Sequence, residues 1–211
     1  MRKFIDKHLT LWTQREFLVS VLIGLLILAV GLTATNFANH YATLRASNWV
    51  TDIILDNIPV VNVSFLYSQG ALLFLVIVAL ILILEPKRVP FVLKSLGLFF
   101  IVRSIFMTLT HIAAPPQMSV LNYTDLINRL SSGDDLFFSA HTGLPFLLAL
   151  VFWNEKYLRY LFILATLAGG TIVLLGHLHY SIDVFSAFFI SFGIYHMAMF
   201  LFKKEYKLMR G

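Results

Sequence analysis

The sequence predicts an all-α integral membrane protein, a six-transmembrane-helix bundle with both termini in the cytoplasm. Of its 211 residues, 59% are hydrophobic and only 13% are charged, whereas a soluble domain carries about a quarter charged residues. Six long apolar runs follow one another along the chain, and the basic residues gather in alternate loops between them. The length suits one bundle, so residues 1–211 are expected to form a single membrane domain.

The six apolar runs are each close to the ~20 residues that cross a bilayer as a helix, and the fourth is at the short limit. They are continuously apolar rather than alternating, which excludes a transmembrane β-barrel. No small-residue cleavage site follows the first run, so it is expected to be a retained helix. The predicted spans are Phe17–Thr35, Ser64–Leu84, Phe91–His111, Phe138–Trp153, Leu158–Gly176 and Tyr180–Phe202.

The basic residues predict how the bundle is inserted. Thirteen of the 16 Lys and Arg residues lie at the two termini, between the second and third spans, or between the fourth and fifth. By the positive-inside rule these segments face the cytoplasm. The fourth and sixth spans then begin at the extracytoplasmic face, which places His141 and His179 at the same depth. Topology therefore explains the net charge of +5, and nucleic acid is not expected as a partner.

Two short sequences at these helix starts carry the predicted chemistry. His179 precedes Asp183 by four residues, so both side chains share one helix face. Such a pair resembles a nucleophile with its orienting carboxylate. His141 stands behind Ser139 at the start of another helix, as a general acid beside an anion site would. These motifs together predict phosphoester chemistry at a membrane surface, with His179 attacking phosphorus and His141 protonating the leaving group.

Ser139 and Arg103 are also expected to support the site, and several of the site residues have simpler interpretations. Ser139 is expected to cap the fourth span. Arg103 lies inside an apolar run, which costs ~3 kcal/mol or more unless the charge is paired or faces a polar cavity, so a phosphate or Asp183 is its expected partner. The alternatives are that Arg103 ties helices together, that the charge of Asp183 stabilises a helix dipole and that Tyr180 is an interfacial anchor.

Thiol and metal chemistry are not expected. The chain contains no cysteine, so a disulfide, a thiolate zinc site and a thiol nucleophile are all excluded. His177 and His179 form an H-x-H pair, but no third ligand has a matching spacing. Neither a metal nor another cofactor is predicted.

These motifs resemble those of a known family. The segments Asp135-x-x-x-Ser139-Ala140-His141-Thr142 and His179-Tyr180-Ser181-Ile182-Asp183-Val184 resemble the two catalytic motifs of the sphingomyelin synthase family, a branch of the type 2 phosphatidic acid phosphatase superfamily. Arg103-Ser104-Ile105-x-Met107-x-x-Thr110 resembles a third motif upstream. The agreement in order and spacing runs roughly from Arg103 to Tyr195, about half of the chain, and the six-span topology agrees over all of it.

The resemblance implies a role for each matching residue. His179 would be the nucleophile, Asp183 its partner and His141 the acid and base. The residues expected to bind the substrate phosphate or support the site are Arg103, Ser139, Asp135, Thr142 and Tyr180. The catalytic core would cover roughly residues 91–202.

The implied reaction moves a phosphocholine or phosphoethanolamine head group from a phospholipid to a lipid alcohol, without a metal, on the extracytoplasmic leaflet. The chain lacks an extra cytoplasmic domain, so it resembles a minimal member in a bacterial inner (plasma) membrane. The expected acceptor is then diacylglycerol or a ceramide-like lipid. Ala140 stands where the family usually has glycine, and Val173 stands where the broader phosphatases carry an arginine. The missing arginine favours the synthase branch.

Two alternatives remain open at this point. One is a lipid phosphate phosphatase or phospholipase C-like hydrolase with the same His-His-Asp site, in which water takes the phosphoryl group. The other, from a different class, is a non-catalytic lipid-binding or transport protein, because polar residues within spans can mark a substrate path. The sequence shows no paired Gly/Pro breaks in corresponding halves, the usual sign of a transport repeat.

Overall fold

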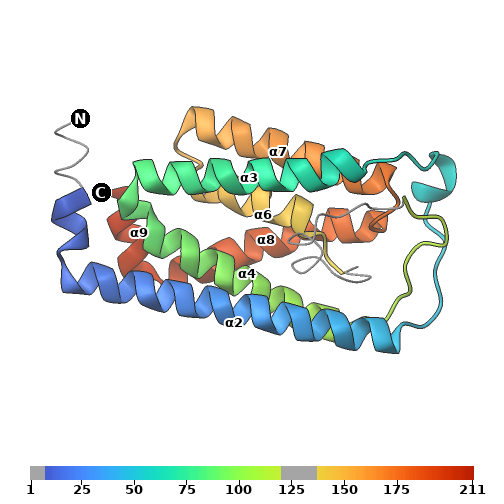
Figure 1. Ribbon diagram of the computed structural model, residues 1–211, viewed down its shortest axis with the longest axis horizontal. Helices are drawn as coiled ribbons and strands as arrows, with labels where there is room; N and C mark the ends of the chain where they lie inside the picture. Colours follow the sequence, from blue (N-terminus) through green and yellow to red (C-terminus); the bar gives the residue numbers. More distant parts are fainter. Residues whose placement is uncertain (1–7, 120–136) are drawn as a thin grey trace.

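The computed structural model describes residues 8–119 and 137–211, and all regular elements within those ranges are helical. The helices run along a common long axis, and the start of α2 lies at the same end of the molecule as α9 (Figure 1). The long helices are α2 (Arg15–Arg45), α3 (Ser64–Leu84), α4 (Val89–Leu109), α7 (Lys156–Leu175) and α8 (Ser181–Leu201). The shorter elements are η1 (Leu55–Asn57), η2 (Pro86–Arg88), α6 (Ala140–Val151) and α9 (Lys203–Arg210).

Five of the described helices are long and apolar enough to cross a membrane, with α4 extended by η2. This supports the prediction of a helical membrane protein. The first predicted span ended too early, at Thr35, because α2 continues to Arg45. Polar residues such as Asn36 and Asn39 follow Thr35, but neither Gly nor Pro interrupts the chain between residues 32 and 45, so the helix can continue.

The fourth predicted span, Phe138–Trp153, is shorter in the structure. Helix α6 has 12 residues, which is about 18 Å of helix against a hydrocarbon core of about 30 Å. Most of its side chains are buried, and α6 lies between neighbouring helices of the bundle (Figure 1). A short helix is tolerated there because protein rather than lipid surrounds it. The core around α6 contains Phe99, Phe138, Leu147, Phe162 and Ile194, each exposed by 1% or less.

Helices α2 and α4 pack closely through glycine. A Cβ placed on Gly31 would lie 2.7 Å from the carbonyl oxygen of Gly97, and one on Gly97 would lie 2.7 Å from the backbone of Ile27. Only hydrogen fits at either position, and small residues are the usual means by which membrane helices approach one another. This packing fixes the position of α4, which carries Arg103 toward the site.

The opposite end of α4 is tied to the C-terminal helix by a polar cluster. The ammonium group of Lys94 donates to Glu205 on α9 and to Ser20 on α2. Lys94 is 5% exposed, and a buried charge is tolerated when it is paired and hydrogen-bonded. The cluster therefore joins three helices at the end of the bundle that lies away from the two motifs.

Candidate active site

The starts of α6 and α8 adjoin one another. The backbone N–H of Ser139, just before α6, donates to the carbonyl oxygen of Asp183 in the first turn of α8 at 3.1 Å. Two motifs that are about 40 residues apart in the sequence therefore meet at one place in the bundle. The segment that carries His141 lies beside the segment that carries His179.

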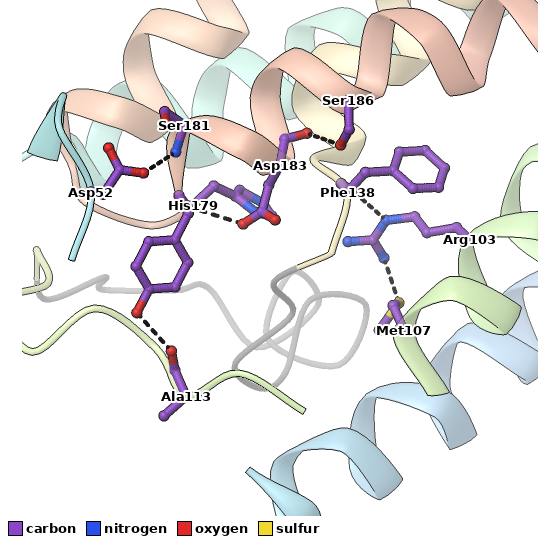
Figure 2. A network of polar contacts seen from close by, with 10 residues as sticks. Asp52, Arg103, Met107, Ala113, Phe138, His179, Ser181, Asp183 and Ser186 are labelled. Atoms are coloured by element: carbon purple, nitrogen blue, oxygen red, sulfur yellow. Dashed lines mark hydrogen bonds and ion pairs between the residues drawn. The ribbon is translucent and has the colours of Figure 1, made fainter. Parts of the chain in front are cut away.

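His179 and Asp183 form a buried pair. The His179 Nδ1 atom lies 3.5 Å from Asp183 Oδ2, and the side chains are 5% and 3% exposed. The same oxygen accepts the backbone N–H of Tyr180 at 3.0 Å, which holds the carboxylate in place (Figure 2). The ring-to-carboxylate distance is longer than an ideal hydrogen bond, as is common in sites without substrate. Because Nδ1 faces Asp183, Nε2 is the ring nitrogen suited to attack.

The position of Asp183 fits both of its expected roles, as a partner of His179 and as a charge at the start of a helix. Its carboxylate faces the imidazole of His179, and it also bonds to a backbone N–H at the start of α8, where a negative charge stabilises the helix dipole.

Asp52, which the motif reasoning did not select, holds the first turn of α8 from a distant loop. Its Oδ2 accepts the Ser181 N–H at 2.7 Å, and its Oδ1 accepts the N–H groups of Ile54 and Leu55. Burial alone would raise the pKa of Asp52, but these hydrogen bonds outweigh burial and lower the pKa below its ordinary value. A carboxylate 129 residues away in sequence therefore caps the helix of the proposed nucleophile, and no local pattern signals such a contact.

Tyr180 joins two loops to the same turn. Its hydroxyl donates to the Ala113 carbonyl at 2.9 Å (Figure 2). The same hydroxyl accepts the Val50 N–H at 3.3 Å. The side chain is 2% exposed. Burial raises the pKa of Tyr180, and the charges of Asp183 and Asp52 add to the rise. Tyr180 is therefore a protonated, buried hydrogen-bonding group that fixes loops over the site.

The start of α6 differs from the start of α8. Ser139 occupies the N-cap position, but its side chain makes no capping hydrogen bond, so the prediction that it caps this helix was wrong. The hydroxyls of Ser139 and Thr142 are buried, and neither has a hydrogen-bond partner within residues 8–119 and 137–211. The first turn of α6 holds no acidic residue. Two unpaired hydroxyls at the positive end of a helix are suited to bind an anion.

His141 is positioned by neighbours on two other helices. Its ring stacks on Tyr67 of α3, with 4.1 Å between the ring centroids and an angle of 32°. Its carbonyl lies against Gly169 of α7, where an added Cβ would overlap the oxygen. Pro145 has no N–H for that carbonyl, so the usual bond to the residue four positions earlier is missing. The tight approach of α7 depends on the glycine.

Arg103 lies beside the start of α6 and is 1% exposed. Its Nε donates to the Phe138 carbonyl at 2.9 Å, and its Nη1 lies 3.2 Å from the sulfur of Met107 (Figure 2). Arg103 therefore links α4 to the residue that precedes Ser139, which fits the alternative of a tie between helices and keeps a positive charge near the anion-binding end of α6.

A cavity reaches this region from the ends of α2 and α4. Asp183 and Tyr180 line one side of it, and Thr43, Met107 and Thr110 lie on the other. Asp135, an expected supporting residue, lies outside the described residues. In the described part of the chain, no group of three or more His, Cys, Asp or Glu side chains has the arrangement of a metal site.

Comparison with protein families gives one match. Residues 133–200 match the family described as PAP2 superfamily C-terminal, about a third of the chain, and this segment contains His141, His179 and Asp183. Comparisons with curated proteins and with solved structures each found no match. The match does not distinguish the sphingomyelin synthase branch from other branches. It supports membership of the PAP2 superfamily and, with it, lipid phosphatase or phosphotransferase activity.

Proposed function

We propose that this protein transfers a phosphorylated head group from a phospholipid to a lipid alcohol through a covalent phosphohistidine on His179. One observation carries the proposal. At the start of α6, the hydroxyls of Ser139 and Thr142 have no partner among the described residues, and the backbone N–H of Ser139 bonds to Asp183, a member of the buried His179–Asp183 pair. Buried polar groups are normally hydrogen-bonded, so these hydroxyls are suited to phosphate oxygens of a substrate.

In the first half-reaction, the phosphate sits at the start of α6 and His179 Nε2 attacks phosphorus. The bond from phosphorus to the lipid oxygen breaks, and His141 gives its proton to that leaving oxygen. Asp183 stabilises the imidazolium character that develops on His179. Arg103 adds positive charge near the phosphate oxygens. In the second half-reaction, a lipid hydroxyl attacks the same phosphorus and releases His179.

The bilayer setting follows from the charge distribution and the apolar helices. The proposed topology has six spans, with α6 as the short fourth span, both termini in the cytoplasm and the site at the extracytoplasmic face of a bacterial inner membrane. The donor is a phosphocholine or phosphoethanolamine lipid, and the acceptor is diacylglycerol or a ceramide-like alcohol.

Hydrolysis is the second candidate function, favoured by the match to a superfamily of lipid phosphatases and phosphotransferases. The first half-reaction is the same, and water replaces the lipid alcohol in the second. The two functions therefore share every residue described above and differ only in the acceptor.

The test uses the full chain purified into vesicles that contain phosphatidylcholine or phosphatidylethanolamine labelled in the head group. We expect label to move to added diacylglycerol or ceramide, and label in a water-soluble product alone would indicate the hydrolase. His179→Ala should abolish both reactions, since loss of a nucleophile commonly costs ~10³-fold or more. His196→Ala is the matched control, because His196 is exposed on α8, the helix that follows His179, and its ring bonds to the Phe192 carbonyl. Equal activity in these two variants would refute the proposal, as would binding of the lipids by the native protein without any turnover.

A further inference from the structure

The turn between α7 and α8 holds a strained histidine. His177 has a φ of 51°, in the left-handed region, and it is the one residue other than glycine with positive φ in the described ranges. It directly follows the end of α7, where the bonds His177 N–H to Leu174 and Leu178 N–H to Val173 form a Schellman motif. Glycine is the usual residue at this position, because a Cβ is disfavoured there.

The same histidine is buried with an unused polar atom. Its side chain belongs to a residue that is 6% exposed, and its Nε2 atom has no hydrogen-bond partner in the described part of the chain. A second unused polar atom lies close by in the fold. Ser119 is 7% exposed, its hydroxyl also lacks a partner among those residues, and its backbone N–H donates to the carbonyl of Gly176 at 2.9 Å.

These features together argue against a purely structural role for His177. Glycine would relieve the backbone strain, and any apolar side chain would remove the unpaired nitrogen. Strain and unpaired buried groups are both costly and are typical of functional sites. His177 is two residues from His179, so their Cα atoms lie within about 7 Å of each other.

We propose that His177 and Ser119 form a subsite that binds the hydroxyl group of the acceptor in the second half-reaction. A hydroxyl donates one hydrogen bond and accepts others. With its Nε2 atom protonated, the His177 imidazole can donate to the acceptor oxygen, and so can the Ser119 hydroxyl, which leaves the single O–H proton of the acceptor for His141. The ligand is therefore a hydroxyl group, which belongs to the lipid acceptor in the transferase and to water in the hydrolase. This inference rests on the proposed function.

The step balances as follows. The acceptor oxygen bonds to phosphorus while the bond from phosphorus to His179 Nε2 breaks, and the bonding pair returns to the imidazole. The acceptor proton passes to His141, which lost its own proton to the leaving group in the first step. His177 and Ser119 hold the acceptor oxygen in line but exchange no proton in the balance.

The test measures the second half-reaction alone. The full chain in vesicles is incubated with head-group-labelled phosphatidylcholine without acceptor, and the labelled phosphohistidine is isolated by rapid quenching. Diacylglycerol is then added in one arm and only water is present in the other, and loss of label from the protein is timed. We expect His177→Gly to form the labelled intermediate at the native rate and to lose it about tenfold more slowly, as expected for one lost hydrogen bond.

Three further variants make the result specific. His177→Asn tolerates the left-handed backbone and keeps a polar side chain, so it should recover part of the rate. Ser119→Ala should slow the same step, whereas Ser95→Ala should not, because Ser95 lies on α4 and is also a buried serine whose hydroxyl has no partner in the described ranges. His177→Gly should melt at or above the native temperature, which separates loss of function from loss of folding.

The outcomes distinguish the inference from the proposed function. A native protein that forms no labelled intermediate overturns the proposed function and the subsite with it. A labelled intermediate that His177→Gly loses at the native rate overturns the subsite alone. A His177→Gly variant that is slow in forming the intermediate also overturns it, because His177 would then act in the first half-reaction.

Discussion

Replacing Gly169 by alanine should displace His141 without touching any reacting side chain. An alanine Cβ would overlap the His141 carbonyl oxygen and lie 3.0 Å from the carbonyl carbon, and real Cβ atoms essentially never come closer than that. Because the obstacle is backbone rather than a flexible side chain, α6 or α7 has to move. A displacement of about 1 Å at a reacting group can cost ~10²-fold in rate, so we expect turnover to fall by about that factor.

The stability of this variant can be set against a matched control. Overpacking costs about 1–3 kcal/mol, and glycine to alanine within a helix contributes up to about 1 kcal/mol in the other direction. Gly169→Ala should therefore be neutral to about 2 kcal/mol less stable. Gly193→Ala on α8 has nothing within 4 Å of its added Cβ, so it should be more stable and fully active. Head-group transfer and thermal unfolding measure both. Native turnover in Gly169→Ala would refute the placement of His141 against α7.

Three other substitutions test the surroundings of the site. Asp52→Asn should lower the melting temperature at neutral pH. Because folding lowers the pKa of Asp52, its contribution is present above its ordinary value of 3.8 and is lost as pH falls further, so the two melting curves should converge in acid. Arg103→Lys removes the Nε donor to Phe138 and should cut turnover about tenfold. Lys94→Met leaves Glu205 bonded to the Ser20 hydroxyl but without its cation, and it should cost about 3 kcal/mol of stability with turnover per folded molecule unchanged.

Each of these has a matched control. Glu16→Gln, Arg45→Lys and Lys204→Met change exposed residues of the same types and should have little effect. An Asp52→Asn curve parallel to the native one at every pH would contradict the capping role of the carboxylate. Native turnover in Arg103→Lys would show that activity does not need the bond from Arg103 Nε to Phe138. Unchanged stability in Lys94→Met would show that the polar cluster does not hold α9.

The helical membrane character of the protein could be predicted from sequence because it depends on local composition. Runs of about 20 apolar residues fix a helix wherever they occur, and residues 8–119 and 137–211 contain five long apolar helices. The exact ends could not be predicted in the same way. Helix α2 continues past Thr35 because polar residues are tolerated where a helix leaves the apolar region, and α6 is short because its neighbours cover it.

In the candidate site, too, some features follow from local sequence and others depend on contacts between distant segments. His179 and Asp183 face one another, but His179 lies in the turn before Tyr180, the N-cap of α8, so the contact depends on that turn and not on helix periodicity alone. Tyr67 beneath His141 and Asp52 at the start of α8 are contacts between distant segments, and no local pattern encodes them. The cap expected from Ser139 was wrong, because its hydroxyl bonds to none of the described residues. Ser139 instead contacts α8 through its backbone N–H, which donates to the Asp183 carbonyl.

The bond between the beginnings of α6 and α8 involves main-chain atoms only. Every residue other than proline at position 139 keeps this N–H donor. Substitutions at His141 or His179 also leave both main-chain atoms of the bond in place, so the two helices should stay docked. A variant that is inactive because His141 or His179 is replaced should therefore still bind its lipid substrate. Such variants are suited to trapping the natural donor from a membrane extract and identifying it by mass.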